Sequence, residues 1–389
     1  MKKFFILTLI GLVLVSKNAT AQEDNSTIDQ RVITTAVPFV LIAADPRSAG
    51  MGDIGVATSA DAFSQQWNPA KYAFAISKQG VGVTYTPYLS QLVNDIFLGN
   101  LTYYNRINER SAVAGSLRYF STGEIELRET ADQQPLIVNP NELLLDVSYS
   151  LRLSERFALG VAGRFISSNL KFPTGNEDSS AASTFAVDVA GYYQSEEIAY
   201  NDFDGRWRAG FNISNVGPKL KYDETGQENN LPTNLGLGAG FDFILDAYNK
   251  VGLSLEVNKL LVPTPQDFDG DGDIDAEDDE EYEDIGFFSG IFQSFGDAPD
   301  GFSEELKEFT WALGAEYWYQ DFFALRTGYF NESEEKGSRK FLSIGAGFKY
   351  TAINIDVSYL FSTSKVRSPL EGTLRFGLTF NFGDEYDEY

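Results

Sequence analysis

The sequence predicts an all-β protein, a 14-stranded antiparallel transmembrane β-barrel with an N-terminal hatch, or plug, inside the barrel. From residue 78 to residue 382 the chain repeats segments of about ten residues in which apolar and polar side chains alternate, as in a strand with one apolar face. We count fourteen such segments, and an even number is typical of closed bacterial barrels. Aromatic residues such as Tyr103-Tyr104 and Tyr317-Trp318-Tyr319 stand at segment ends, where outer-membrane barrels carry interfacial girdles.

The N-terminus has the pattern of a secretory signal peptide. Lys2 and Lys3 precede the apolar run Phe4–Val15, and Ala19-Thr20-Ala21 supplies small residues for cleavage. The apolar run is too short to span a membrane, so we expect residues 1–21 to be removed before Gln22. Residues 22–77 then form an N-terminal periplasmic or hatch segment that is too long to be a simple tail.

Composition excludes several classes of function. The chain has no histidine and no cysteine, which excludes Ser–His and Cys–His catalysis and histidine- or thiolate-bound zinc. The formal charge of −26 becomes −29 once Lys2, Lys3 and Lys17 leave with the signal peptide, and such a chain repels nucleic acid. Because no spacing singles out a carboxylate or Ser–Lys pair, we predict that the protein is not an enzyme.

The alternating segments could also build a soluble β-sandwich, so further features must decide. Short connections such as 107–109 alternate with long ones at 123–140, 217–230 and 261–306, the rhythm of turns and loops in an outer-membrane barrel. In lipid the sheet must close to pair its edges, so the polar faces line a lumen. The charged residues predicted there are Arg118, Asp146, Arg152, Asp188, Asp356 and Arg375, which we interpret as interior ion-pair partners that stiffen the barrel.

The order of the connections predicts an orientation in the outer membrane of a Gram-negative bacterium, with outer-membrane lipid around the wall. If both chain ends are periplasmic, the first strand runs outward and the long connection 261–306 faces the cell exterior. Residues 383–389 are then an acidic periplasmic tail.

The long connection contains a calcium-type motif, QDFDGDGDIDAEDDEE. An EF-hand-type loop requires oxygen ligands at alternating positions, a glycine at position 6 and a carboxylate at position 12. Gly272 stands at position 6, and an aspartate replaces the usual glutamate at position 12. The predicted ligands of a structural Ca²⁺ are Asp267, Asp269, Asp271, Asp273, Asp275 and Asp278. The alternative is a solvated acidic loop without metal.

An aromatic stretch, IGFFSGIFQSFG, follows the acidic run. Large apolar residues in an exposed connection indicate a surface for a protein partner or a lid over the lumen. The predicted contact residues are Ile285, Phe287, Phe288, Ile291, Phe292 and Phe295. A plug that packs into the barrel is the alternative left open.

The hatch segment contains a formal G-x-G-x-x-G at Gly50, Gly52 and Gly55. A dinucleotide site would need a βαβ unit around these glycines, and the sequence predicts none. The glycines instead allow tight packing of a compact segment inside the barrel. Asn68-Pro69 then ends the segment with turn chemistry.

The stretch DPRSAGMGDIGVATSADAFSQQWNPAKYA, residues 45–73, resembles the hatch signature of FadL-type outer-membrane proteins, and the fourteen predicted strands agree with that family. Within it, TTAVPFVLIAADPRSAGMGDIGVAT, residues 34–58, resembles the PorV (LptO) branch. The resemblance implies a component of the type IX secretion system of Bacteroidetes. Its implied partners are the giant translocon barrel, a cell-surface sortase and the C-terminal signal domains of secreted proteins.

A second function stays open, because FadL-type proteins are passive channels for hydrophobic small molecules. Such a channel needs an apolar outer pocket and a lateral opening in the wall, often at a disrupted strand. The third predicted strand, 111–121, alternates cleanly, and the charged luminal faces argue against lipid passage.

Overall fold

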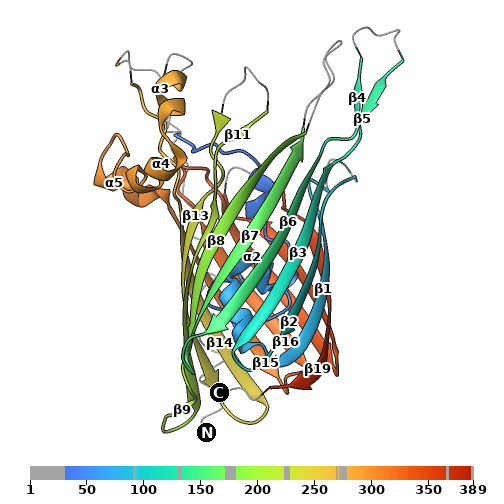
Figure 1. Ribbon diagram of the computed structural model, residues 1–389. Coiled ribbons are helices and arrows are strands. Elements are labelled where there is room, and N and C mark those ends of the chain that lie inside the picture. Colours follow the sequence, from blue (N-terminus) through green and yellow to red (C-terminus); the bar gives the residue numbers. More distant parts are fainter. Residues whose placement is uncertain are drawn as a thin grey trace, which may run out of the picture.

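The computed structural model describes residues 31–386 apart from 91–92, 94, 129–133, 171–180, 223–227, 269, 271–277 and 365–367. Within these residues fourteen long strands form one closed antiparallel sheet (Figure 1). They are β1 (Ser77–Pro87), β2 (Ile96–Arg106), β3 (Ser111–Thr122), β6 (Asn141–Arg152), β7 (Phe157–Asn169), β8 (Ala182–Gln194), β10 (Asp204–Val216), β13 (Asn234–Ile244), β14 (Asn249–Leu260), β15 (Phe309–Tyr319), β16 (Phe323–Asn331), β17 (Lys340–Tyr350), β18 (Ile353–Ser362) and β19 (Leu374–Glu385). The pairing of β1 with β19 closes the barrel, which confirms the predicted fold.

The remaining elements are short. Two hairpins, β4 (Ile125–Leu127) with β5 (Leu136–Val138) and β11 (Leu220–Lys221) with β12 (Glu228–Asn229), lie in connections, and β9 (Ile198–Ala199) pairs with the start of β10. The hatch contains η1 (Pro38–Leu41), α1 (Pro46–Ala49), α2 (Ser64–Trp67) and η2 (Pro69–Phe74). The connection between β14 and β15 contains α3 (Asp279–Asp284), α4 (Phe287–Gln293), α5 (Phe302–Glu305) and η3 (Leu306–Glu308). No helix in the described part of the chain is long and apolar enough to cross a membrane.

The two ends of the barrel differ, as Figure 1 shows. The loop end carries the hairpin β4–β5, the strand β11 and the helices α3 to α5. The turn end carries tight connections such as 107–110 and 153–156, together with β9. Consecutive strands run between these ends, so each long connection is followed by a short turn.

The wall has an apolar outer face and a polar inner face. Along β6, Leu145, Val147 and Tyr149 are exposed on the outside, and Val147 keeps 69% of its surface. Asp146 and Ser148, which alternate with them, are buried toward the lumen. This arrangement is the reverse of a water-soluble barrel and is the pattern of a barrel surrounded by lipid.

The hatch lies inside the lumen, and its described part starts at the loop end (Figure 1). Arg31 lies there, with its Nη1 2.9 Å from Oε2 of Glu304 in the long connection. The predicted periplasmic position of the mature N-terminus concerns residues outside the described part of the chain and stays a prediction. The apolar run 36–44 is mostly buried inside the upper lumen.

From the loop end the hatch descends through the barrel to the turn end. Phe39 and Val40 pack against Leu98, Leu144 and Ile166 of the wall. Farther along, the hatch residues from 43 to 75 are mostly buried, and β1 then starts at the turn end (Figure 1).

The last strand is longer than predicted. The sequence pattern ends the barrel at residue 382 and assigns residues 383–389 to a tail. In the structure β19 continues to Glu385, which pairs with Ser77, and Nζ of Lys78 lies 3.3 Å from Oδ2 of Asp384. Acidic side chains at the aqueous end of a strand cost little desolvation, so alternation of apolar residues is no guide to where such a strand stops.

Candidate docking surface and the luminal hatch

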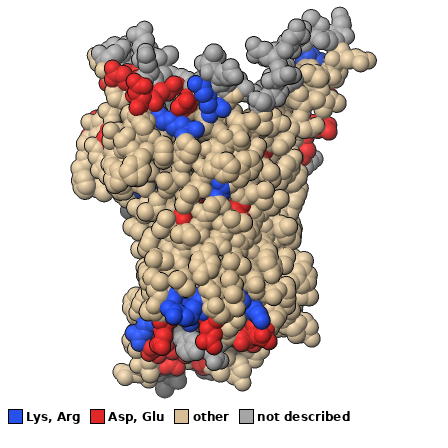
Figure 2. Space-filling model, in the orientation of Figure 1, with Lys and Arg blue, Asp and Glu red and all other residues tan. Residues whose placement is uncertain are grey.

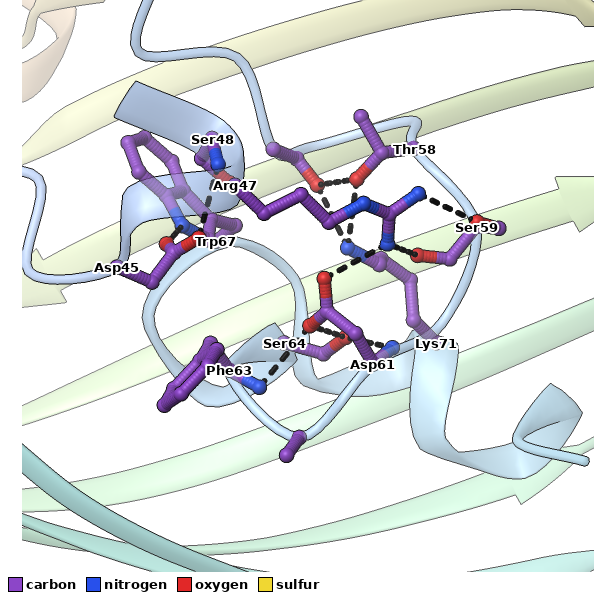
Figure 3. Close-up of polar contacts among 12 residues, drawn as sticks. Asp45, Arg47, Ser48, Thr58, Ser59, Asp61, Phe63, Ser64, Trp67 and Lys71 are labelled. Atoms are coloured by element: carbon purple, nitrogen blue, oxygen red, sulfur yellow. Dashed lines mark hydrogen bonds and ion pairs between the residues drawn. The ribbon is translucent and has the colours of Figure 1, made fainter. Parts of the chain in front are cut away.

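Asp45 organises the first helix of the hatch. Its Oδ1 accepts a hydrogen bond from the backbone N–H of Ser48 at 2.8 Å, which caps α1, and Pro46 occupies the first helical position. Its Oδ2 accepts the indole N–H of Trp67 at 2.7 Å (Figure 3). Burial, and then the nearby Asp61 carboxylate, raises the pKa of Asp45 to about 6.

Arg47 joins the hatch to the wall. Within the hatch its Nη1 donates to Oδ2 of Asp61 at 2.8 Å and its Nη2 donates to Oγ of Ser59 at 2.7 Å (Figure 3). Toward the wall its Nε and Nη2 donate to the two carboxylate oxygens of Glu316 at 3.0 and 2.8 Å. Arg326 donates to the same carboxylate at 2.7 Å. Glu316 is therefore shared between a hatch arginine and a wall arginine.

Lys71 is a second buried cation of the hatch. Its Nζ donates to the carbonyl oxygen of Gly55 at 2.9 Å and to Oγ1 of Thr58 at 3.0 Å (Figure 3). The side chain is fully buried, and burial lowers the pKa of Lys71 to about 8. The two hydrogen bonds donated by Nζ thus connect residues 55 and 58 of the hatch.

The predicted hatch glycines lie where backbones approach closely. A Cβ on Gly50 would be 3.1 Å from the Cα of Gly345 in β17. Gly52 has φ +82°, and a Cβ there would be 3.1 Å from the backbone of β16. A Cβ on Gly55 would overlap the ring of Trp67, at 2.1 Å. These contacts are made with the wall and with the hatch itself.

Asn68 and Pro69 start the last hatch helix, η2. Oδ1 of Asn68 accepts the backbone N–H of Ala70 at 3.0 Å, and Pro69 occupies the first helical position. Nδ2 of Asn68 donates to the carbonyl oxygens of Val56, at 2.9 Å, and of Gly191 in β8, at 3.0 Å. One amide side chain therefore caps a helix and ties two hatch turns to the wall.

The charged residues predicted in the lumen are all buried there. They are Arg118, Asp146, Arg152, Asp188, Asp356 and Arg375. Asp356 of β18 pairs with Arg326 of β16 at 2.6 Å, as an interior ion pair. Arg118 and Arg152 instead donate to carbonyl oxygens of the hatch, at 3.0 Å each. The interpretation of these residues as ion-pair partners that stiffen the wall is therefore incomplete, because some of them bind the hatch instead.

Three important side chains were not singled out from the sequence, namely Arg47, Glu316 and Glu256. Oε2 of Glu256 accepts the backbone N–H groups of Gly55, at 2.9 Å, and of Val56, at 2.8 Å. The available signal was an acidic residue on the polar face of a predicted strand. That signal does not say which hatch group it meets.

A buried ion cluster fastens the long connection to the rim of the barrel. Nζ of Lys259, at the end of β14, lies 2.8 Å from Oε1 of Glu305 and 2.5 Å from Oε2 of Glu308. Nζ of Lys336 lies 2.7 Å from Oε1 of Glu304 and 3.0 Å from Oε1 of Glu308. The cluster holds α5 and η3 against two wall hairpins.

Only the two ends of the calcium-type motif are described. Oδ1 of Asp267 accepts the backbone N–H of Gly270 at 2.6 Å, and Oδ1 of Asp278 accepts that of Phe268 at 2.6 Å. The other predicted ligands, Asp269, Asp271, Asp273 and Asp275, lie outside the described residues. Calcium binding therefore stays a prediction.

The aromatic stretch forms an exposed surface at the loop end, which we call the α4 surface. Its members are the exposed Phe287, Phe288, Phe292 and Phe295 and the half-buried Ile285 and Ile291. Phe288 and Phe292 keep 63% and 67% of their surface, and their rings contact each other at 5.4 Å in an edge-to-face arrangement. Gly290 is the buried side of the helix, against Pro263. The residues do not plug the lumen, which is the alternative that the sequence left open.

The family is decided by comparison of the sequence with protein families. The model for "Type IX secretion system protein PorV" matches residues 25–267, more than half of the chain. The chain belongs to the PorV family. No curated protein sequence matches it. The family is that of a β-barrel component of a secretion system.

Solved structures show that this PorV-family barrel has a FadL-like fold. The CymD monoaromatic hydrocarbon channel covers 90% of this chain and 99% of its own, with 14% identity and a TM-score of 0.50. The toluene transporter TbuX of Ralstonia pickettii has 13% identity, covers 89% of this chain and 100% of its own, and has a TM-score of 0.49. A FadL homologue of Pseudomonas aeruginosa has 11% identity, covers 91% of this chain and 100% of its own, and has a TM-score of 0.44. At these identities the similarity concerns the fold alone.

Proposed function

We propose that this PorV-family protein partners the translocon barrel of the type IX secretion system and hands secreted proteins to the cell-surface sortase. Membership of the family supports a role in that system. In this proposal the loop end faces the cell exterior, and the protein binds its partners without chemistry. The expected partners are the giant translocon barrel, the sortase and the C-terminal signal domains of secreted proteins.

The observation that carries the proposal is the exposed α4 surface. Phe288 and Phe292 project from the loop end on a helix whose buried side faces Pro263. Adjacent exposed phenylalanines are costly in water and are common at the centre of protein interfaces. The acidic run 277–284 precedes them, so the surface would select a partner that offers an apolar patch beside basic residues.

The second candidate, a passive channel for hydrophobic molecules, is supported less well. The upper lumen is occupied by the apolar side chains of Phe39 and Val40 and is not an open pocket. Strand β3 pairs with β2 from Ala112 to Thr122 and with β6 from Ser111 to Ser121 without a shift of register, so the wall is not interrupted at the third strand. A channel would need an open pocket in the upper lumen and an interruption of the wall.

The test is purification from native outer membranes in mild detergent, followed by mass spectrometry of what accompanies the protein. The wild type is compared with the double variant Phe288→Ser, Phe292→Ser and with Tyr248→Ser, a control in a turn at the opposite end whose side chain is 57% exposed. We expect the wild type and Tyr248→Ser to carry a very large β-barrel and secreted proteins that share a C-terminal domain. The α4 variant should lose them while retaining a folded barrel.

Two results would overturn the proposal. A wild-type barrel that purifies alone with bound hydrophobic molecules would favour the channel. Retention of the same partners by the double variant would show that the α4 surface does not dock them.

A further inference from the structure

The segment Phe302–Glu308 has its charged face inside and its apolar face outside. Phe302 and Leu306 lie one helical turn apart and keep 76% and 55% of their surface. Glu304, Glu305 and Glu308 lie on the other side and are buried against the barrel rim. A surface helix in water buries its apolar side and exposes its charges, so this segment is inverted.

The charged side is held firmly in place. Glu304 accepts from Lys336 at 2.7 Å and from Arg31 of the hatch at 2.9 Å, and Glu308 accepts from Lys259 at 2.5 Å. Turning the apolar face inward would break this network and leave buried charges without partners. The exposure of Phe302 and Leu306 is thus built into the fold.

The apolar face continues the lipid-facing wall. Strand β15 starts at Phe309, directly after the segment, and its residues Trp311 and Leu313 are 37% and 52% exposed on the outer face. Figure 1 shows α5 beside the wall, outside the outline of the barrel. In Figure 2 the bulge at this position is mostly uncharged and merges below with the uncharged belt of the barrel.

We propose that Phe302–Glu308 is a membrane-contact element, in which Phe302 and Leu306 insert into the interfacial layer of the leaflet on the loop side. The layer that these two side chains contact is the boundary between lipid head groups and acyl chains. Short apolar faces backed by charge bind this layer, and aromatic side chains favour it. Lys307 adds a cation beside this face, and its Nζ pairs with Glu335 at 2.6 and 2.7 Å.

A lipid surface is favoured over a protein partner because the face is continuous with the wall that lipid already covers. The segment would anchor the long connection laterally and leave α4 free. The proposal does not depend on the secretion role, since it would hold for any barrel with this connection.

Site-directed spin labelling tests the proposal, because the chain has no cysteine of its own. Nitroxide labels are placed on Phe302→Cys and Leu306→Cys, on Leu313→Cys as the lipid-facing reference and on Ser289→Cys as the reference on α4. The protein is reconstituted in vesicles of phosphatidylethanolamine and phosphatidylglycerol. Collision of each label with oxygen, which concentrates in lipid, is compared with collision with a water-soluble nickel chelate.

We expect the oxygen-to-nickel ratio at residues 302 and 306 to lie near that of residue 313 and several-fold above that of residue 289. Ratios at both sites equal to that of residue 289 would overturn the proposal. If addition of the purified translocon barrel then shields both labels from nickel, the segment is a docking face for protein. Because Phe302 and Leu306 are exposed, their replacement leaves the fold intact, and the two sites check each other.

Discussion

Arg47 of the hatch and Glu316 of the wall form a bidentate ion pair, with Nε to Oε1 at 3.0 Å and Nη2 to Oε2 at 2.8 Å. Both side chains are buried, and 269 residues separate them in the chain. Paired, planar hydrogen bonds of this kind fix orientation as well as distance. The pair therefore fixes the position and orientation of α1 relative to β15.

Replacement of Arg47 by Met should release the hatch. The change keeps the length of the side chain but leaves the Glu316 carboxylate with Arg326 alone, and breaking a buried pair costs about 3 kcal/mol. A thiol introduced by Ala49→Cys, at a fully buried hatch position, reports opening through its rate of alkylation by a maleimide. We expect that rate to rise roughly a hundredfold.

Arg156→Met is the matched control, since Arg156 pairs with Glu196 on the exposed turn end. Its effect on the alkylation rate should be negligible. Equal rates in the two variants would mean that the Arg47 pair does not hold the hatch.

Gly328→Ala should prevent the hatch from packing against the barrel wall. A Cβ at this position in β16 would lie 1.9 Å from the backbone carbon of Met51, and a backbone atom cannot rotate away. Gly163→Ala in β7 is the control, because a Cβ there meets nothing within 4 Å. We expect limited proteolysis to cut the hatch in the first variant alone, with the barrel intact in both. A protected hatch in Gly328→Ala would contradict the close approach.

The strands were predictable because alternation of side chains follows directly from strand geometry, and the lipid-facing side of β6 is apolar at Leu145, Val147 and Tyr149. The partners of luminal charges were not predictable. Alternation places Glu316 on the inner face, but which hatch group it meets depends on the register of β15 and on the path of the hatch. The path of the hatch was not predictable either, because an apolar run such as 36–44 is compatible with either end of the lumen.

The inverted segment Phe302–Glu308 shows a second limit. The sequence FSEELKE has an ordinary amphipathic pattern, and a pattern does not say which face is buried. Here the cations at Lys259, Lys336 and Arg31 decide it, and they come from three distant parts of the chain.

The hatch should be least stable between about pH 6 and pH 8. The pKa of Asp45 is raised to about 6 from 3.8, so the folded hatch prefers the protonated acid, and this contribution is lost as pH rises from 3.8 through 6. The pKa of Lys71 is lowered to about 8 from 10.5, so the folded hatch prefers the neutral amine, and stability is lost as pH falls from 10.5 through 8. Alkylation of the Ala49→Cys thiol, corrected for thiolate formation, should show this maximum of opening.

The fluorescence of Trp67 should report the ionisation of Asp45 directly. Its indole donates to Asp45, so its fluorescence should titrate near pH 6 in a protein whose other three tryptophans are replaced by Phe. Asp45→Asn, which keeps the size of the side chain and removes its ionisation, should abolish the titration. A titration that survives this change would assign the transition to another group.

Calcium should order the acidic run of the long connection, if the predicted ligands bind it. The described ends already bring Asp267 and Asp278 into turns that close the loop, with Gly270 at φ +81° between them. Extracellular calcium modules bind with Kd on the order of 10⁻⁴–10⁻³ M, so millimolar calcium should protect residues 267–284 from a glutamate-specific protease, and EGTA should remove the protection. Asp271→Asn with Asp273→Asn should weaken binding in titration calorimetry, while Asp202→Asn, in an exposed turn-end connection, should leave it unchanged. Cleavage that is equally fast with calcium and with EGTA would leave a solvated acidic loop, whose charge would then act on partners without a metal.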